Sequence, residues 1–184
     1  MLKPLTALGN DAPEVLTFGT FIITERFDVA LASVALRRGR EKDLAKAAKS
    51  LGLPLPPASM ATGGSTFSAF WMTPDMWMVE AAFATHEDIA GHLKLALGEA
   101  ASVTEQTDAW VRFDISAVNL TPLMERLSNL DLTTLPDGFA SRTVIEHLGV
   151  YLIKRSDTEI TLYGPRASAK SLVHALEVTA KSVL

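Results

Sequence analysis

One order of strand-like and helix-like stretches occurs twice in this chain, and it constrains the fold more than any motif does. In the first copy, "DVALASVALR" (28–37) has the β-branched and apolar residues typical of a strand. In "REKDLAKAAKSLG" the apolar residues Leu44, Ala48 and Leu51 recur at helical spacing, with charged residues between them. This stretch predicts an amphipathic helix that Gly52 ends.

The first copy continues with a hairpin and a second helix. Pro74 and Asp75 predict a tight turn between a strand ending near Met72 and another strand covering Met76–Ala82. The stretch "THEDIAGHLKLALG" then predicts a helix with Thr85 as its N-cap and acidic residues in its first turn. The first copy therefore has the order strand, helix, strand, strand, helix.

The second copy follows "ASVTEQTD" in the same order. "AWVRFDIS" predicts a strand, "LTPLMERLSNL" a helix, "RTVIEHLGVYLIKR" and "TEITLYG" two strands around the turn "SD", and "SAKSLVHALEVTAKSVL" a final amphipathic helix. The phase is also similar, because Leu44 corresponds to Leu123 and Asp75 to Asp157 at nearly equal spacing.

We therefore expect an α+β fold of two similar βαββα halves, with mostly antiparallel sheets covered by helices. The predicted halves are about 28–100 and 109–184, within a single domain of residues 19–184. Residues 1–18 are interpreted as an N-terminal extension.

Composition excludes several classes of partner and site. A net charge of −4 and no basic run longer than "LRRGR" give no footprint of a nucleic-acid binder. The absence of cysteine excludes disulfides, thiolate nucleophiles and cysteine-ligated metals. No apolar stretch is long enough for a signal peptide or a membrane span, so we expect a cytoplasmic protein with no membrane contact.

The stretch "FWMTPDMWMVEA" (70–81) is open to two interpretations. Both alternating faces of 76–79 are apolar, which suits a strand buried on both sides, either inside the fold or under a partner. Core packing is the commoner role of such residues. A mean hydropathy of +0.20 also fits either a well-filled core or a surface for protein contact.

The chain shows no catalytic motif. The closest histidines, His86 and His92, are predicted to point to different sides of a helix, so we expect no metal site. There is no phosphate-binding loop and no nucleophile elbow. Asp114, beside Arg112 on one strand face, and Glu146, next to His147, are the least trivial carboxylates. For Asp114 an ion pair with Arg112 is the favoured interpretation.

Several segments resemble the γ subunits of heterotetrameric sarcosine oxidases in order and spacing. They include "VALASVALRRGR", "FWMTPDMWMVEA", "SVTEQTDAWVRFDI", "MERLSNLDL", "SRTVIEHLGVYLI" and "SAKSLVHALE", and they span nearly the whole chain. A weaker similarity, through "TPDMWMV" and "NLDLTTLPDG", extends to the folate-binding domain of the glycine-cleavage T-protein. No folate-binding residue can be assigned from it, because this chain is shorter than a T-protein.

The resemblance implies a non-catalytic subunit that assembles and stabilises an oxidase complex. That complex demethylates sarcosine to glycine, transfers the carbon to tetrahydrofolate or releases formaldehyde, and produces hydrogen peroxide. FAD, FMN, NAD and zinc would belong to the partners, which are large flavin- and NAD-binding subunits and a small zinc subunit, and this chain would hold no cofactor. Candidates for the interface are Trp71, Trp77, Trp110, Tyr151 and Arg166.

Two alternatives remain open at this point. The chain could be a stand-alone tetrahydrofolate-binding one-carbon protein related to the T-protein, or a self-associating relative with no oxidase around it. An assembly subunit is also expected to self-associate when it is isolated from its partners.

Overall fold

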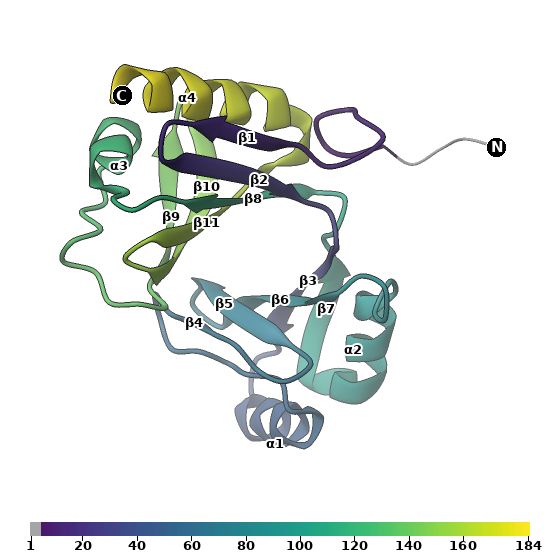
Figure 1. Ribbon diagram of the computed structural model, residues 1–184. Helices are drawn as coiled ribbons and strands as arrows, with labels where there is room; N and C mark the ends of the chain where they lie inside the picture. The colour runs from purple at the N-terminus through teal and green to yellow at the C-terminus, as the bar shows by residue number, and fades with distance from the viewer. Residues whose placement is uncertain (1–4) are drawn as a thin grey trace. The chain divides into compact units, whose positions relative to one another are not determined.

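The computed structural model describes residues 5–184, which form two compact units (Figure 1). Unit 1 combines the described residues up to Phe27 with Asp108–Leu184, and unit 2 is Asp28–Thr107. In each unit all paired strands are antiparallel, and two α-helices pack on one face of the sheet. The expected α+β class is confirmed. The predicted domain boundaries stay a prediction.

Unit 2 contains a five-stranded sheet with the order β4-β5-β6-β3-β7. Helices α1 and α2 cover one face of it, where their apolar side chains share a core with alternate residues of β3 and β6. In chain order its elements are β3 (Val29–Leu36), α1 (Glu41–Leu51), β4 (Ala61–Thr62), β5 (Ser68–Thr73), β6 (Met76–Ala82), α2 (Ile89–Leu97), the short 3-10 helix η1 (Gly98–Ala100) and β7 (Ala101–Glu105).

Local sequence explains the limits of α1 and of the β5–β6 hairpin. Gly52 ends α1 in the left-handed conformation (φ 68°), where its N–H group bonds the carbonyl groups of Ala48 and Lys49. At the hairpin, Asp75 takes a positive φ of 60°, which a short polar side chain tolerates. Both elements lie where the sequence predicts them.

The predicted N-cap of α2 is wrong. The helix begins at Ile89, and the carboxylate of Asp88 accepts a hydrogen bond from the N–H group of Gly91 at 2.9 Å. Thr85 lies in the preceding turn, where its hydroxyl donates to the carbonyl group of Ala82. The acidic residues expected in the first turn therefore precede the helix.

Unit 1 contains a six-stranded sheet with the order β1-β2-β8-β11-β10-β9. Helices α3 and α4 bury apolar residues against one face of it. In chain order its elements are β1 (Val15–Phe18), β2 (Phe21–Arg26), β8 (Trp110–Ser116), α3 (Thr121–Leu127), β9 (Ala140–Ile145), β10 (Leu148–Ser156), β11 (Glu159–Pro165), the 3-10 helix η2 (Arg166–Ser168) and α4 (Ala169–Ser182).

The stretch 142–155 forms two strands where the sequence predicts one. Glu146 and His147 make a tight turn between β9 and β10, with φ values of 49° and 69°. Two successive positive φ values fit the twist of a hairpin, but they usually require glycine or asparagine. The sequence therefore carries no ordinary turn signal at this point.

The segment interpreted as an N-terminal extension is part of unit 1 where the structure describes it. β1 pairs with β2 along the edge of the sheet, and Leu8 is buried in the core. The buried carboxylate of Glu25 accepts hydrogen bonds from the N–H groups of Leu8 and Glu14. Residues 1–4 of the predicted extension lie outside the described residues.

The two halves of the chain each exchange one strand. β2 directly precedes β3 in the chain, yet it pairs with β8, placing Ile23 opposite Ile115. β7 directly precedes β8, yet it pairs with β3, placing Val103 opposite Val34. With this exchange, the order β9-β10-β11-β8-β2 repeats the order β4-β5-β6-β3-β7, which confirms the two similar halves.

Both interpretations of the tryptophan- and methionine-rich stretch 70–81 apply to some of its residues. Met78 and Val79 are fully buried, which confirms a strand enclosed on both faces there. Trp71 and Trp77 keep part of their surface exposed. Within residues 5–184, no helix is both long and apolar enough to cross a membrane.

Candidate functional site

The polar face of β8 carries a group of charged side chains in unit 1. Val111, Phe113 and Ile115 point into the core beneath α3 and α4, so the alternating residues lie on the opposite face of the sheet. The predicted alternation is confirmed, and this helix-free face carries Trp110, Arg112, Asp114 and Ser116.

Asp114 is the centre of a hydrogen-bond network. Its two carboxylate oxygens accept from Nε and Nη2 of Arg112 at 2.9 and 3.0 Å, which confirms the predicted ion pair. The hydroxyl of Thr161, on the neighbouring strand β11, donates to Oδ1 of Asp114 at 2.7 Å. Nη1 of Arg26, from β2, lies 3.5 Å from Oδ2. Three strands therefore supply donors to one carboxylate.

The network extends along β10 and β11. Nε of Arg155 donates to the hydroxyl of Thr161 at 3.0 Å, and the guanidinium group of Arg112 lies over the ring of Tyr163 at 5.9 Å from its centroid. Thr161 and Tyr163 have no exposed surface, and the side chain of Asp114 is 12% exposed. Arginine stays protonated in proteins, so this largely buried network offers positive charge and directed donors.

Two of the predicted interface residues meet beside this network. The rings of Trp110 and Tyr151 pack edge to face, with centroids 5.4 Å apart. Tyr151 lies opposite Tyr163 in the β10–β11 pair. Burial raises the pKa of the Tyr151 hydroxyl, while the nearby charge of Arg142 lowers it to a smaller extent.

The other three candidates lie elsewhere. Trp71 and Trp77 face each other across the β5–β6 hairpin, and Nε1 of Trp77 donates to the carbonyl group of Pro56 at 2.8 Å. Arg166, in η2, donates from Nη2 to the carbonyl group of Leu5 at 2.9 Å. The structure thus brings together Trp71 with Trp77 and Trp110 with Tyr151, while Arg166 fastens the N-terminal segment of unit 1.

The histidine prediction is wrong in its geometry. The rings of His86 and His92 lie close together, with centroids 5.6 Å apart, because α2 begins only at Ile89 and His86 belongs to the turn before it. Nδ1 of His86 lies 2.9 Å from the hydroxyl of Thr85. Within residues 5–184, no three histidine or carboxylate side chains gather in a group that could hold a metal ion.

Glu146 and His147 form no site with other polar groups among the residues that the structure describes. Both occupy the exposed β9–β10 turn.

Unit 1 contains a buried lysine that no sequence pattern predicts. Lys154 is 4% exposed, and its Nζ donates to the carboxylate of Asp157 at 2.7 Å and to the carbonyl group of Leu135 at 2.9 Å. Asp137 lies 3.6 Å away. The hydrogen bond to Asp157 raises the pKa of Lys154, and Asp137 adds to the effect. Lys154 therefore anchors the loop before β9 to the end of β10.

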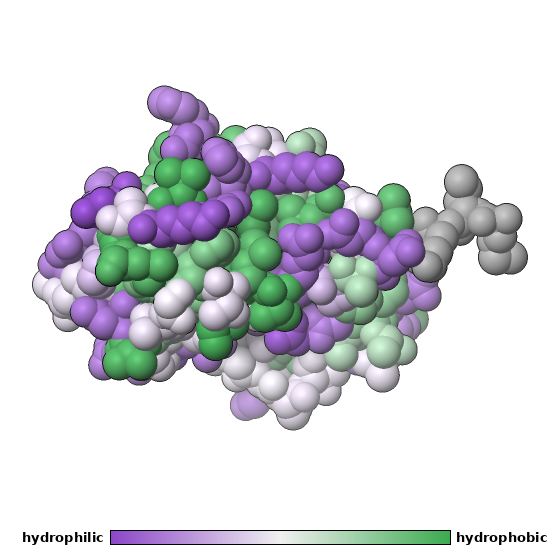
Figure 2. Space-filling view, turned by 45° about the horizontal axis from the view of Figure 1, so that its top comes forward, coloured by the Kyte–Doolittle hydropathy of each residue, from purple (hydrophilic) through white to green (hydrophobic). Residues whose placement is uncertain are grey.

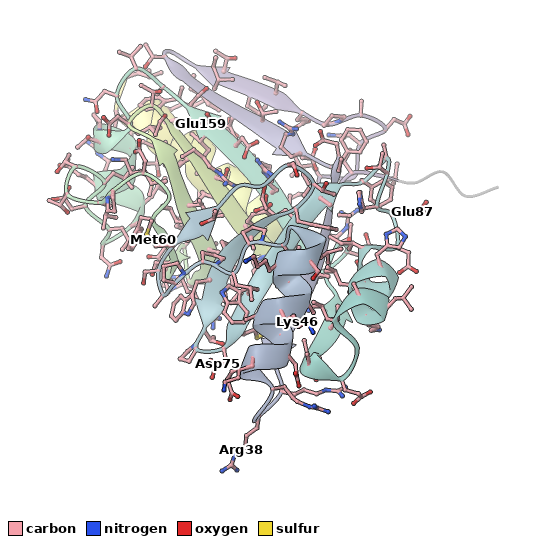
Figure 3. All side chains as sticks on the ribbon, turned by 90° about the horizontal axis from the view of Figure 1, so that it is seen from below. Arg38, Lys46, Met60, Asp75, Glu87 and Glu159 are labelled. Carbon is pink, nitrogen blue, oxygen red and sulfur yellow. The ribbon has the colours of Figure 1, made fainter. Side chains whose placement is uncertain are left out.

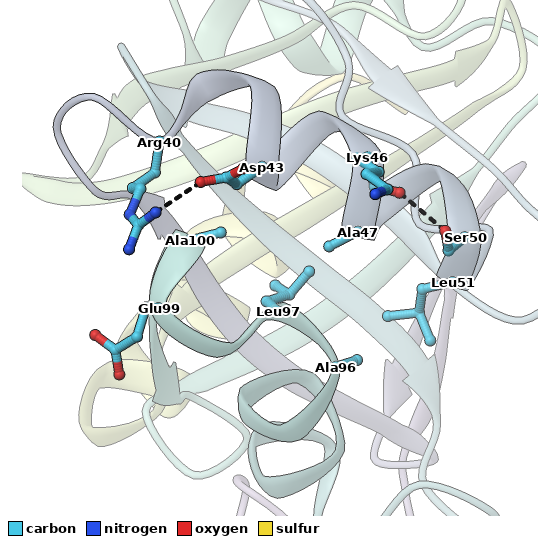
Figure 4. Close-up of a pocket in the computed structure, with 10 residues that line it drawn as sticks. All are labelled: Arg40, Asp43, Lys46, Ala47, Ser50, Leu51, Ala96, Leu97, Glu99 and Ala100. Carbon is cyan, nitrogen blue, oxygen red and sulfur yellow. Dashed lines mark hydrogen bonds and ion pairs between the residues drawn. The ribbon is translucent and has the colours of Figure 1, made fainter.

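An open groove lies between helices α1 and α2 in unit 2 (Figure 4). Ala47, Leu51 and Leu97 form its apolar floor. Arg40 lies on its rim and pairs with Asp43 at 2.8 Å. The sequence predicts the two amphipathic helices but not the groove, which lies where small alanine side chains line the space between them.

In the view of Figure 2, hydrophilic residues separate several apolar patches, so the exposed apolar side chains do not form one continuous surface there. Among the large apolar residues of 5–184, Leu95 on α2 and Val118 in the β8–α3 loop are the most exposed, at 88% and 83%. These positions are not among the predicted interface residues.

No protein-family model matches this sequence, and no curated protein does. Solved structures do resemble it. A chain of heterotetrameric sarcosine oxidase from Corynebacterium sp. U-96, in a complex with pyrrole 2-carboxylate, matches 92% of this chain over 88% of its own length. The TM-score is 0.79 and the sequence identity 18%.

A second similar structure is the glycine cleavage system aminomethyltransferase T from Bartonella henselae. It matches 85% of this chain with a TM-score of 0.62 and 10% identity, and the match spans 48% of the aminomethyltransferase. At these identities the likeness concerns the fold. The resemblance to both kinds of protein is confirmed at that level.

Proposed function

We propose that this chain is a non-catalytic subunit of a heterotetrameric sarcosine oxidase, and that it acts in the cytoplasm in assembly and stability of the complex. The observation that carries the proposal is the fold likeness to a chain of such an oxidase over nearly the full length of both chains. The complex would convert sarcosine to glycine, transfer the carbon to tetrahydrofolate or release formaldehyde, and form hydrogen peroxide.

In this proposal the large partner subunits carry FAD, FMN and NAD, and a small subunit carries zinc. The chain has exposed side chains of the kinds that are used in assembly interfaces. Stable interfaces bury on the order of 1,200 Å² or more and use aromatic and arginine residues at their centres. Trp71 and Trp77 on the β5–β6 hairpin are partly exposed and fit that role.

Co-expression with the large and small subunits tests the proposal. The expected result is one stoichiometric complex in size-exclusion chromatography, with sarcosine turnover in the complex and none in the purified chain. The isolated chain is expected to self-associate, which light scattering measures. A monomer that ignores these partners, or that oxidises sarcosine alone, would contradict the proposal.

The likeness to the aminomethyltransferase favours a second candidate, a stand-alone tetrahydrofolate-binding one-carbon protein. A ligand that binds only the folded state raises the melting temperature by mass action. Tetrahydrofolate should then stabilise the isolated chain, whereas free glutamate, which shares its acidic tail, should not. No shift at saturating tetrahydrofolate would remove this candidate.

A further inference from the structure

Basic side chains in unit 2 are concentrated in one short segment. Residues 37–49 contain six lysine or arginine residues and two acidic residues, although the whole chain has a net charge of −4. All six are exposed. They are Arg37, Arg38, Arg40, Lys42, Lys46 and Lys49.

The three lysines lie on one face of α1. Leu44 and Ala48 turn the opposite face of the helix into the core. Spacings of three and four residues place Lys42, Lys46 and Lys49 next to one another on the outer face. Like charges at such spacings repel, so the helix carries an unfavourable arrangement that an acidic neighbour would relieve.

The acidic residues of the segment do not neutralise these lysines. The carboxylate of Asp43 pairs with Arg40, and that of Glu41 accepts from the N–H group of Gly39 at 3.2 Å. Arg37 pairs with Glu99.

Four cations of the segment make no ion pair within residues 5–184. They are Arg38, Lys42, Lys46 and Lys49, named here the basic face. Figure 3 shows Arg38 extending away from unit 2 and Lys46 on α1.

The basic face borders the apolar groove between α1 and α2. Lys46 lies on the rim of the groove beside the floor residues Ala47 and Leu51 (Figure 4). An apolar centre with a charged rim is the usual anatomy of a protein interface. A phosphate backbone has no apolar group to pack against the floor of this groove, whereas a protein surface can offer apolar side chains for the floor and carboxylates for the basic face. The arrangement therefore favours an acidic protein surface over a nucleic acid.

We propose that the basic face and the adjoining groove dock onto an acidic surface of a partner subunit. This inference rests on the proposed assembly function and names the surface that would serve it. Charges at an interface mainly steer association and select the partner, so the contact should weaken as salt is added.

The test measures binding of the purified chain to the purified large subunits by biolayer interferometry. The variant Lys42→Glu/Lys46→Glu reverses two charges of the basic face. The control Lys94→Glu/Lys170→Glu makes the same change in net charge at two exposed lysines, on α2 and α4, that make no ion pair within the described part of the chain. Circular dichroism and the melting temperature verify folding, and Lys42→Gln/Lys46→Gln provides a milder variant with the same sites.

In low salt, the reversal is expected to raise Kd about tenfold or more, with the control within about twofold of the wild type and the glutamine variant between them. Added salt should weaken the wild type more than the reversed variant. If the wild type binds and the reversal changes nothing, or if the control loses as much, the docking surface is wrong while the assembly function stands. If the wild type does not bind the large subunits, both proposals fail. Equal affinity for a DNA duplex, lost in the same variant, would also overturn an acidic protein as the partner.

Discussion

Arg112 and Asp114 occupy alternate positions of β8, and the guanidinium group of one holds the carboxylate of the other through hydrogen bonds of 2.9 and 3.0 Å. Thr161 donates to the same carboxylate from β11. The pair thus joins two neighbouring strands on the helix-free face of unit 1, and it contributes to stability only while both partners are present.

Removing the carboxylate should destabilise unit 1. Asp114→Ala leaves the largely buried guanidinium group of Arg112 without its main partner, so we expect a loss of about 3 kcal/mol in the free energy of unfolding. Urea denaturation measures it. The control Asp43→Ala removes the exposed partner of Arg40 and should cost less than about 1 kcal/mol. Equal losses in the two variants would contradict the role given to the network.

Lys154 predicts a dependence of stability on pH. Its pKa is raised by the hydrogen bond to Asp157, so the folded state holds the proton more tightly than the unfolded chain does. The stabilisation is complete below the pKa of an unfolded lysine, about 10.4, and is lost as pH rises through the higher folded value. Lys154→Met should lower the free energy of unfolding by about 2 kcal/mol at neutral pH.

The difference in the free energy of unfolding between the wild type and Lys154→Met should stay constant from neutral pH to about pH 10. It should become smaller above that pH. Urea denaturation across this pH range measures the difference. Lys49→Met, at an exposed position of α1, is the control and should show no such narrowing. A difference in the free energy of unfolding that grows at alkaline pH would contradict the direction assigned to the pKa shift of Lys154.

The turn between β9 and β10 can be improved. Glu146 and His147 both hold positive φ values that asparagine and glycine adopt with less strain. The double change Glu146→Asn/His147→Gly should raise the free energy of unfolding by about 1 kcal/mol. His147→Ala keeps a side chain at the same φ and should give no gain. Thermal denaturation compares them, and a lower melting temperature for the double variant would contradict the turn geometry.

Two single substitutions, Asp88→Ala and Thr85→Ala, test where α2 begins. Asp88→Ala removes the cap that accepts from Gly91 and should cost about 1 kcal/mol. Thr85→Ala removes only an exposed hydroxyl in the preceding turn and should change stability by less than about 0.5 kcal/mol. If the losses were reversed, the helix would begin at Thr85 as the sequence suggests.

Local patterns predict much of the fold, because periodicity and turn residues act within a few positions. β6 covers Met76–Ala82, as predicted for the strand that follows the Pro74–Asp75 turn. The pattern misses β7, whose sequence "ASVTE" has few apolar residues, and the Glu146–His147 turn, which lacks glycine, asparagine and proline. β7 is determined by its pairing with β3, which is distant in the sequence, and the turn by the pairing of β9 with β10 on either side of it.

In the candidate site, too, contacts within one strand can be predicted from the sequence, whereas contacts between strands cannot. The contact between Arg112 and Asp114 is predictable because alternate residues of a strand share a face. The contributions of Arg26 and Thr161 require knowledge that β2 and β11 flank β8, and that of Arg155 requires knowledge that β10 lies next to β11. Likewise, the closeness of His86 and His92 depends on where α2 begins, because a later helix start leaves His86 outside the helix and changes the direction of its ring relative to that of His92.

The exchange of strands between the two halves also shapes how the chain must fold as it leaves the ribosome. β2 is synthesised early, but its partner β8 emerges only after all of unit 2. Until then, Phe21 and Ile23 cannot reach the core that they complete with Phe113. β1 can already pair with the other edge of β2, so the nascent chain exposes one edge of a β1–β2 hairpin and its apolar face while unit 2 is synthesised. Conditions that slow this synthesis should favour aggregation of the chain over its folding.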